Sequence, residues 1–206
     1  ANSIFRNALS TEHLFRRKKG ARSWKDQAGQ GYEAHGSGRW LWYSFAFGVR
    51  CDTEFESGRE MALNEIERWV DLNAPEALWI IWTGCEPAQQ LTPEIVHYFK
   101  KKDFCQAIET SGLFPVPDNL DWVSLSPKIA EHVIKRNFEA VDELRYVRHS
   151  GQAIPEPSIK AEHYIISPHS NGDSIDPENL RHCVELVKQN PKWKLSVQQH
   201  KQWKLL

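Results

Sequence analysis

ALWIIWTGCEP (residues 77–87) is the stretch that decides the fold. Its first six residues are apolar, with β-branched and aromatic members, and a polar group follows at once. Short apolar runs of this kind are typical of buried strands. Because the carboxyl ends of parallel strands meet at one face, such polar groups are predicted to form a single large pocket there. The pattern recurs as FCQAI (104–108) before Glu109-Thr110-Ser111-Gly112, DWVSL (121–125) before Ser126-Pro127-Lys128, EHYII (162–166) before Ser167-Pro168-His169, and KLSV (194–197) before Gln198-Gln199-His200-Lys201.

Helical patterns separate several of these strands. In the clearest helix, Leu180, Val184 and Val187 form one apolar stripe after an Asp176-Pro177 start. Another helix begins at Thr92-Pro93-Glu94, which combines an N-cap, a first-turn proline and an acid near the positive end of the helix dipole. Helices are predicted at 62–72, at about 92–102, more weakly at 129–139, and at 176–190.

Two further strands complete the predicted sheet, RWLWYSFAF (39–47) and ELRYV (143–147). Alternating strands and helices imply a mostly parallel sheet with right-handed crossovers. With about six or seven strands, the sheet is too small for a closed eight-stranded barrel. The predicted fold is therefore α/β, an open, partial β/α barrel. Residues 1–206 suit one domain, and residues 10–39 are predicted to be its loop-rich N-terminal segment.

The composition excludes some function classes. The net charge of −1 gives no electrostatic reason to expect nucleic acid as a partner. No apolar run approaches the length of a membrane span, and no signal peptide is evident, so we expect no membrane association and a cytoplasmic protein. The four cysteines are then expected to be free thiols or metal ligands. No two of them have CxxC spacing.

Short motifs in a fixed order point to one family. They are Cys51-Asp52-Thr53 followed by an acidic and aromatic pair, TGCEP (83–87), IETSG (108–112), WVSLSPK (122–128), ELRYV (143–147) and KWKLSVQQHK (192–201). The chain resembles the 7-carboxy-7-deazaguanine synthases of the radical S-adenosylmethionine (SAM) superfamily in these motifs. The resemblance covers most of the chain, from about residue 27 to residue 201.

The resemblance implies a function and a set of cofactors. Members of the family are partial barrels of the radical SAM type and are usually dimeric. They convert the pterin 6-carboxytetrahydropterin to 7-carboxy-7-deazaguanine, with release of ammonia, on the route to queuosine and other 7-deazapurines. The implied cofactors are SAM, a [4Fe–4S] cluster and Mg²⁺. Three thiolates hold three irons of such a cluster and leave the fourth iron open.

The resemblance also assigns site residues. The chemistry matches the assignment in part, because Mg²⁺ prefers hard oxygen ligands such as a threonine hydroxyl. The implied residues are Gly29, Gln30, Thr83, Glu109, His200 and Lys201 for substrate binding, Gly84, Cys85, Glu86, Ser126, Pro127, Lys128, Ser167, Pro168 and His169 for cofactor binding, and Cys51 and Thr53 for metal binding.

The chain departs from the family pattern at the cluster loop. The family carries C-x3-C-x2-C, whereas here only the last cysteine, Cys51, is present, and the loop after Gly48 is about five residues short. Ser44 stands near the position of a family arginine, Gln30 replaces an acid, and Cys85 replaces the second glycine of TGGEP. Cys85 is one possible substitute ligand. The alternatives are a cluster-less homologue that binds a pterin or deazapurine as a sensor or regulatory protein, and an unrelated α/β enzyme.

Several residues also have structural interpretations. Glu86 and Glu109 could instead bond to neighbouring backbone amides or to an arginine, and Lys128 could be a surface lysine. Cys105 begins a strand at the edge opposite Cys51, and Cys183 is predicted to be a buried, inert thiol. Tryptophans 40, 42, 69, 79, 82, 122 and 193 are expected in the core, and histidines 35, 97, 132, 149, 163 and 182 are expected to be surface or structural residues.

Overall fold

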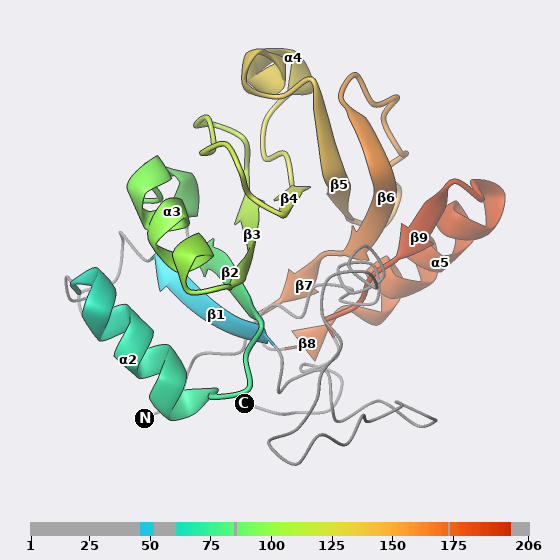
Figure 1. Cartoon of the computed structure of the whole chain (residues 1–206). Coiled ribbons are helices and arrows are strands. Elements are labelled where there is room, and N and C mark those ends of the chain that lie inside the picture. The colour runs from blue at the N-terminus through green and yellow to red at the C-terminus, as the bar shows by residue number, and fades with distance from the viewer. Residues whose placement is uncertain (1–45, 52–60, 85, 173, 199–206) are drawn as a thin grey trace, which may run out of the picture.

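The computed structural model describes residues 46–51, 61–84, 86–172 and 174–198. Strands and helices alternate over most of this part of the chain (Figure 1). The strands are β1 (Ala46–Cys51), β2 (Trp79–Gly84), β3 (Cys105–Thr110), β4 (Trp122–Leu125), β5 (Ala140–Arg148), β6 (Lys160–Pro168), β7 (Ser170–Asn171), β8 (Ser174–Ile175) and β9 (Trp193–Leu195). The helices are α2 (Leu63–Asn73), α3 (Pro93–Lys101), α4 (Glu131–Ile134) and α5 (Pro177–Gln189), and short 3-10 turns lie at Pro87–Gln89 and Lys135–Asn137.

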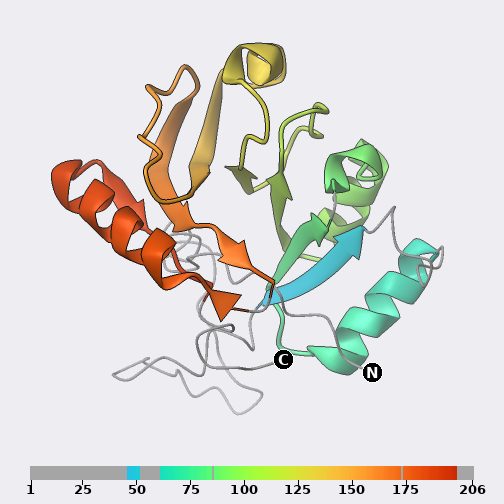
Figure 2. The ribbon, with the colours of Figure 1, turned by 180° about the vertical axis from the view of Figure 1, so that it is seen from behind.

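The main sheet has seven strands in the order β1-β2-β3-β4-β5-β6-β9. Every neighbouring pair in it is parallel. The strands follow a curve, and the helices lie along its outer side (Figures 1 and 2). β1 and β9 are the two ends of the order and do not pair with each other, so among the described residues the barrel is open. The prediction of an α/β fold with an open, parallel partial barrel is confirmed.

One half of the outer side is covered by α2 and α3. Val70 of α2 and Phe99 of α3 pack with Ile80, Trp82 and Ile108 of the strands beneath them. All five side chains are buried, and burial of apolar side chains on this scale is the main stabilising term of such a layer.

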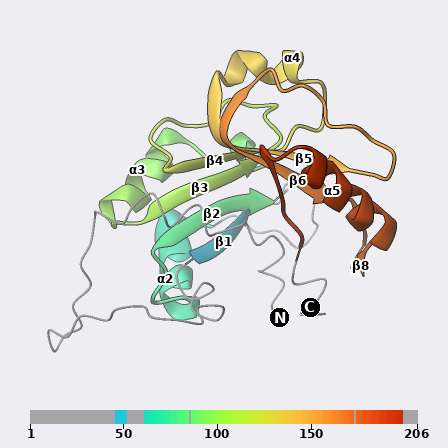
Figure 3. The ribbon, with the colours of Figure 1, turned by 90° about the vertical axis from the view of Figure 1, so that its right-hand side faces the viewer.

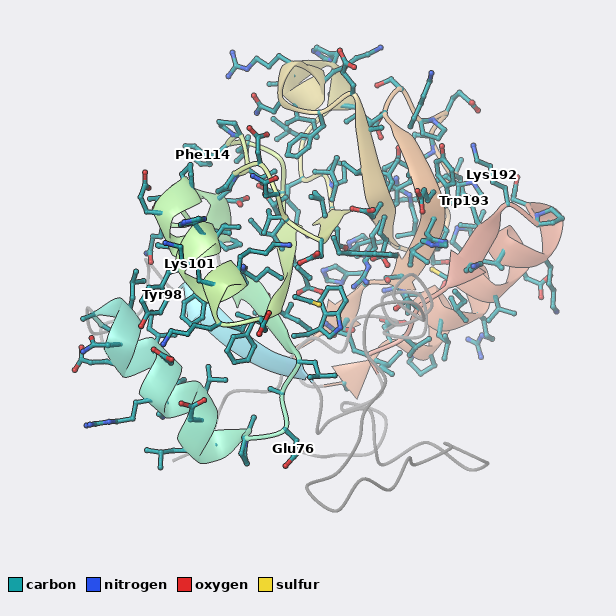
Figure 4. All side chains as sticks on the ribbon, in the orientation of Figure 1. Glu76, Tyr98, Lys101, Phe114, Lys192 and Trp193 are labelled. Atoms are coloured by element: carbon teal, nitrogen blue, oxygen red, sulfur yellow. The ribbon has the colours of Figure 1, made fainter. Side chains whose placement is uncertain are left out.

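The two helices of this half are also joined by polar contacts. The Tyr98 hydroxyl donates to Glu67 at 2.5 Å, and the Lys102 ammonium lies 2.8 Å from the same carboxylate. Figure 4 shows Tyr98 on α3. These contacts fix α3 against α2 over the first half of the sheet.

The other half of the outer side is covered by α4 and α5. Ile134 of α4 and Cys183 of α5 pack with Leu125, Leu144 and Ile166 of β4, β5 and β6. The side view in Figure 3 places α5 against the β5–β6 end of the sheet. Each strand therefore buries alternate side chains under helices, which leaves its other side chains on the inner face.

The inner face is apolar near the amino ends of the central strands. Trp79 and Ile81 of β2, Ala107 of β3 and Trp122 of β4 form a small buried cluster there, separate from the two helix-covered clusters. The next inward positions along the strands are polar. The change from apolar to polar along each strand places hydrogen-bonding groups toward the carboxyl ends.

Several predicted boundaries are confirmed. Thr92 accepts a hydrogen bond from the Ile95 amide and Pro93 begins α3, while Asp176 accepts from two amides of the first turn of α5 and Pro177 begins that helix. As predicted, Cys105 begins β3, Cys183 is buried, and the tryptophans at 79, 82, 122 and 193 are buried; tryptophans 40 and 42 lie outside the described residues.

Three sequence-based predictions need correction. The apolar pattern predicts the first strand at 39–47, whereas β1 continues to Cys51, because each residue from Ala46 to Cys51 pairs with β2. The predicted helix at 129–139 shortens to one α-helical turn and one 3-10 turn. The stripe on α5 is buried only in part: Val187 packs against the core beside Cys183, and the fully buried positions are Asn179 and Cys183. The Asn179 amide is buried because it bonds to the segments that follow β5 and β6. Within the described ranges, no helix is long and apolar enough to cross a membrane.

Candidate functional site

The carboxyl ends of β2 and β3 bring together two of the predicted substrate-binding residues. The Thr83 hydroxyl donates to Oε2 of Glu109 at 2.9 Å. Thr83 lies next to the last residue of β2, and Glu109 lies next to the last residue of β3, because the two strands are parallel and in register. The pair is only partly buried. The carboxylate accepts hydrogen bonds, and the hydroxyl can both donate and accept them. Such a pair suits a ligand whose ring carries N–H and C=O groups.

A partly buried arginine lies beside this pair. Nη1 of Arg145 is 4.0 Å from Oε1 of Glu109, and Nη2 of Arg145 is 2.6 Å from Oε1 of Glu143. Ser124 donates to the same Glu143 oxygen at 2.8 Å. Burial disfavours the charged guanidinium, but the carboxylates of Glu143 and Glu109 outweigh that effect and raise the pKa of Arg145.

Sequence reasoning missed these three polar residues. The sequence pattern identifies Glu143 and Arg145 only as part of the strand ELRYV, and Ser124 only as part of DWVSL. A signal was present, since Glu143 and Arg145 are two residues apart and must share a face of any strand. The sequence does not show which carboxylate on another strand lies close to that face.

Glu86 makes backbone contacts of the kind that its alternative, structural interpretation predicts, and its predicted role in cofactor binding stays a prediction. Glu86 is 6% exposed, and its carboxylate accepts hydrogen bonds from the Thr110 hydroxyl at 2.6 Å and from the Ser111 amide at 2.9 Å. It also accepts from the Ser111 hydroxyl and from the Ala88 amide. Glu86 thus ties the segment after β2 to the carboxyl end of β3. It supports the edge of the sheet on which Glu109 lies.

Two predicted cofactor-binding segments follow β4 and β6. The Ser126 amide donates to the Thr110 carbonyl at 2.8 Å, which holds the start of the Ser126-Pro127-Lys128 segment against β3, and Lys128 is exposed. Ser167 and Pro168 end β6, and the His169 ring stacks on the His149 ring at a centroid distance of 3.9 Å. The two segments lie at the same edge as Thr83 and Glu109.

Gly84 ends β2 at this edge in a conformation that favours glycine. Its φ is 127°, which side chains with a Cβ rarely adopt, and its Cα pairs with that of Cys51 across β1 and β2. The predicted residues Thr83, Gly84, Glu86, Glu109, Ser126, Pro127, Lys128, Ser167, Pro168 and His169 all lie at or beyond the carboxyl ends of the parallel strands.

Comparison with known proteins shows to which family the chain belongs. No family model matches the chain. The 7-carboxy-7-deazaguanine synthase of Bacteroides thetaiotaomicron is 32% identical over 152 residues, which cover 73% of this chain and 77% of that protein. The corresponding synthase of Haemophilus influenzae is 32% identical over 167 residues, covering 73% of this chain and 75% of that protein. The chain belongs to the 7-carboxy-7-deazaguanine synthase family.

A solved structure supports the fold described above. The crystal structure of QueE from Escherichia coli matches with a TM-score of 0.50 at 19% sequence identity. The match covers 67% of this chain and 64% of the solved chain, so this chain spans somewhat less than two thirds of that protein. At this identity the likeness concerns the fold alone.

The cysteines of this family member do not fit the cluster that the resemblance implies. Such a cluster needs three thiolates on one loop, but β1 pairs with β2 without interruption from Gly48 to Cys51. Cys105 begins β3 at the opposite edge, and Cys183 is buried in α5, where burial raises the pKa of its thiol to about 11. Since the chain has four cysteines, at most Cys51 and Cys85 remain for the carboxyl edge.

Other predicted residues of the synthase-like site lie outside the described residues. In the part of the chain that the structure describes, no three His, Cys, Asp or Glu side chains gather closely enough to hold a metal ion. Cys51 is placed by its backbone, which ends β1 beside Gly84. Gly29, Gln30, Thr53, Cys85, His200 and Lys201 lie outside the described ranges, so their predicted roles stay predictions.

Proposed function

We propose that this chain binds 6-carboxytetrahydropterin at the carboxyl edge of the sheet, with Thr83 and Glu109 as binding residues. The observation that carries the proposal is the hydrogen bond between these two side chains, backed by Arg145 at 4.0 Å from Glu109. The pterin ring presents N–H donors and a carbonyl along one edge. A carboxylate accepts from such donors, and a hydroxyl both donates and accepts.

The rest of the proposed site follows from the family resemblance. His200 and Lys201 would bind the carboxylate of the pterin, and Gly29 and Gln30 would contact the same ligand. Gly84, Glu86, the Ser126–Lys128 segment and the Ser167–His169 segment would hold SAM. Family membership supports ring contraction to 7-carboxy-7-deazaguanine as the activity, and a cytoplasmic homodimer with Mg²⁺ bound at Thr53 belongs to the same proposal.

The radical step needs a [4Fe–4S] cluster, which would supply the electron that cleaves SAM. The cysteines placed by the structure do not provide three ligands at one loop, so no step through a cluster is assigned to this chain. The same observation favours a second candidate function. In it, the chain is a cluster-less member of the family that binds a pterin or a deazapurine as a sensor or regulatory protein.

Two measurements on the purified chain test the proposal. The first is binding of 6-carboxypterin, the fluorescent oxidised form of the substrate, to the wild-type chain and to Glu109→Gln. We expect saturable binding by the wild type and a loss of about tenfold or more in Glu109→Gln, since a charged acceptor is lost. Glu185→Gln, at the exposed Lys188–Glu185 pair of α5, is the matched control and should bind like the wild type. Absence of wild-type binding would refute the proposal.

The second measurement separates the two candidate functions. Iron and acid-labile sulfide are measured after anaerobic reconstitution, and product formation is then assayed with SAM and 6-carboxytetrahydropterin. About four irons per chain with turnover would establish the synthase and exclude the cluster-less candidate. Pterin binding without iron above background would establish the cluster-less candidate.

A further inference from the structure

A row of polar side chains crosses the inner face of the sheet at one level. The strand register places Glu109 opposite Ser124, and Ser124 opposite Glu143. Glu143 in turn is opposite His163, whose ring stacks on Trp122 of the apolar cluster. In strand order from β2 to β6, the row is Thr83, Glu109, Ser124, Glu143 and His163.

Arg145 lies on the same face of β5 as Glu143 and is held by it. Nε and Nη2 of Arg145 donate to Oε1 of Glu143 at 3.0 and 2.6 Å. Ser124 donates to that oxygen as well, and the Glu143 side chain is 1% exposed. Charge-assisted hydrogen bonds of this kind are strong and fix the orientation of the guanidinium. Glu143 therefore sets where the positive charge of Arg145 lies.

The contact of Arg145 with Glu109 is of a different kind. Nη1 lies 4.0 Å from Oε1 of Glu109, which is the distance of an ion pair and too long for a hydrogen bond. Both side chains are 15% exposed. In such partly buried surroundings a charge at this distance acts more strongly than it would in water. Arg145 thus faces the Glu109 carboxylate from one side, while Thr83 orients it from another.

We propose that Arg145 is a positioning residue for ligand binding, which acts through Glu109 and is itself held by Glu143. The proposal rests on the proposed function, since the ligand is the pterin bound at Thr83 and Glu109. Glu109 accepts hydrogen bonds from N–H donors of the pterin ring, and Arg145 keeps the carboxylate aimed at them. Arg145 itself need not touch the ligand.

The test compares variants that are expected to stay folded. Arg145→Met alone leaves the Glu143 carboxylate buried without its guanidinium, which is expected to destabilise the chain strongly. The comparison is therefore between Glu143→Gln and the double variant Glu143→Gln with Arg145→Met. Both lack the Glu143 charge, and they differ only at Arg145. Arg145→Lys tests whether a positive charge suffices, and thermal unfolding shows whether each variant is folded.

The readout is the affinity for 6-carboxypterin, measured by fluorescence. Glu143→Gln is the reference for this comparison, and we expect the double variant to bind about tenfold more weakly than Glu143→Gln. We expect Arg145→Lys to retain most of the affinity. In a variant that already carries Glu109→Gln and Glu143→Gln, adding Arg145→Met should change the affinity by less than about twofold, because Arg145 acts through Glu109.

Two results would overturn this inference. One is equal affinity of the Glu143→Gln variant and the double variant. The other is an undiminished effect of Arg145→Met in the Glu109→Gln background, which would mean that Arg145 acts independently of Glu109. A wild-type chain that does not bind 6-carboxypterin would instead refute the proposed function, so the two failures are distinguishable.

Discussion

The Tyr146 hydroxyl on β5 donates a hydrogen bond to the carboxylate of Glu131, the first residue of α4. The same carboxylate accepts from the Ser158 amide at 2.6 Å, from the Ser158 hydroxyl at 2.8 Å and from the Ile159 amide at 3.2 Å. Glu131 thus joins α4, β5 and the segment before β6. These elements belong to the half of the sheet that carries Arg145.

Replacement of Glu131 by Ala is expected to lower the free energy of unfolding by about 1–3 kcal/mol, because the buried Tyr146 hydroxyl and the Ser158 and Ile159 donors lose their acceptor. Urea unfolding followed by tryptophan fluorescence measures the change. Glu139→Ala, at an exposed glutamate just before β5, is the control and should change stability by less than about 0.5 kcal/mol. Equal effects of the two substitutions would contradict the role given to Glu131.

The same site predicts how stability depends on pH. Burial opposes the charged form, but hydrogen bonds from Tyr146, Ser158 and Ile159 outweigh it and lower the pKa of Glu131. A carboxyl with a lowered pKa in the folded state contributes stability above its unfolded pKa of about 4.3 and loses that contribution as the pH falls through the folded value. The stability difference between wild type and Glu131→Gln should therefore be largest near neutral pH and shrink below pH 4.3. A difference that is constant from pH 7 to about pH 3 would contradict this assignment.

Gly112, directly after Ser111 at the end of β3, is expected not to tolerate a side chain. Its φ is 86°, and a Cβ would lie 2.7 Å from Cδ1 of Leu125 and 3.1 Å from Cδ1 of Ile134. Gly112→Ala combines left-handed backbone strain with overpacking and should cost about 2–4 kcal/mol. Thermal unfolding measures the loss.

Gly151 is the matched control for this substitution. It has a φ of 81°, but a Cβ there would meet nothing within 4 Å. Gly151→Ala carries only the backbone strain of about 1–2 kcal/mol. If both alanine variants lose the same stability, the close approach of Gly112 to Leu125 contributes nothing measurable.

The strands and helix starts were predictable because their signals are local. An apolar run such as ALWIIW followed by Thr83-Gly84 predicts a strand and its end, and an N-cap followed by proline predicts a helix start, as at Asp176-Pro177. The edge at which the predicted site residues lie then follows from parallel pairing alone. This accounts for the prediction that Thr83 and Glu109 lie at the same edge of the sheet.

The partners of buried polar groups were not predictable, because they depend on strand register and on residues distant in sequence. Gln106 lies within the apolar run FCQAI, yet it is fully buried, with its amide bonded to the Trp82 indole and to the Val96 carbonyl. The contact of Arg145 with Glu109 likewise joins β5 to β3 across β4. No spacing within one strand shows such pairings.

Glu86 and Glu109 look alike in the sequence, but their contacts predict opposite mutational effects. Glu86→Gln removes a carboxylate that is buried and accepts from Thr110, Ser111 and Ala88, so it should lower the free energy of unfolding by about 1–3 kcal/mol. Glu109→Gln should alter stability less and weaken 6-carboxypterin binding more. Unfolding and binding measurements on both variants check this, and a larger binding loss in Glu86→Gln would show that Glu86 contacts the ligand directly.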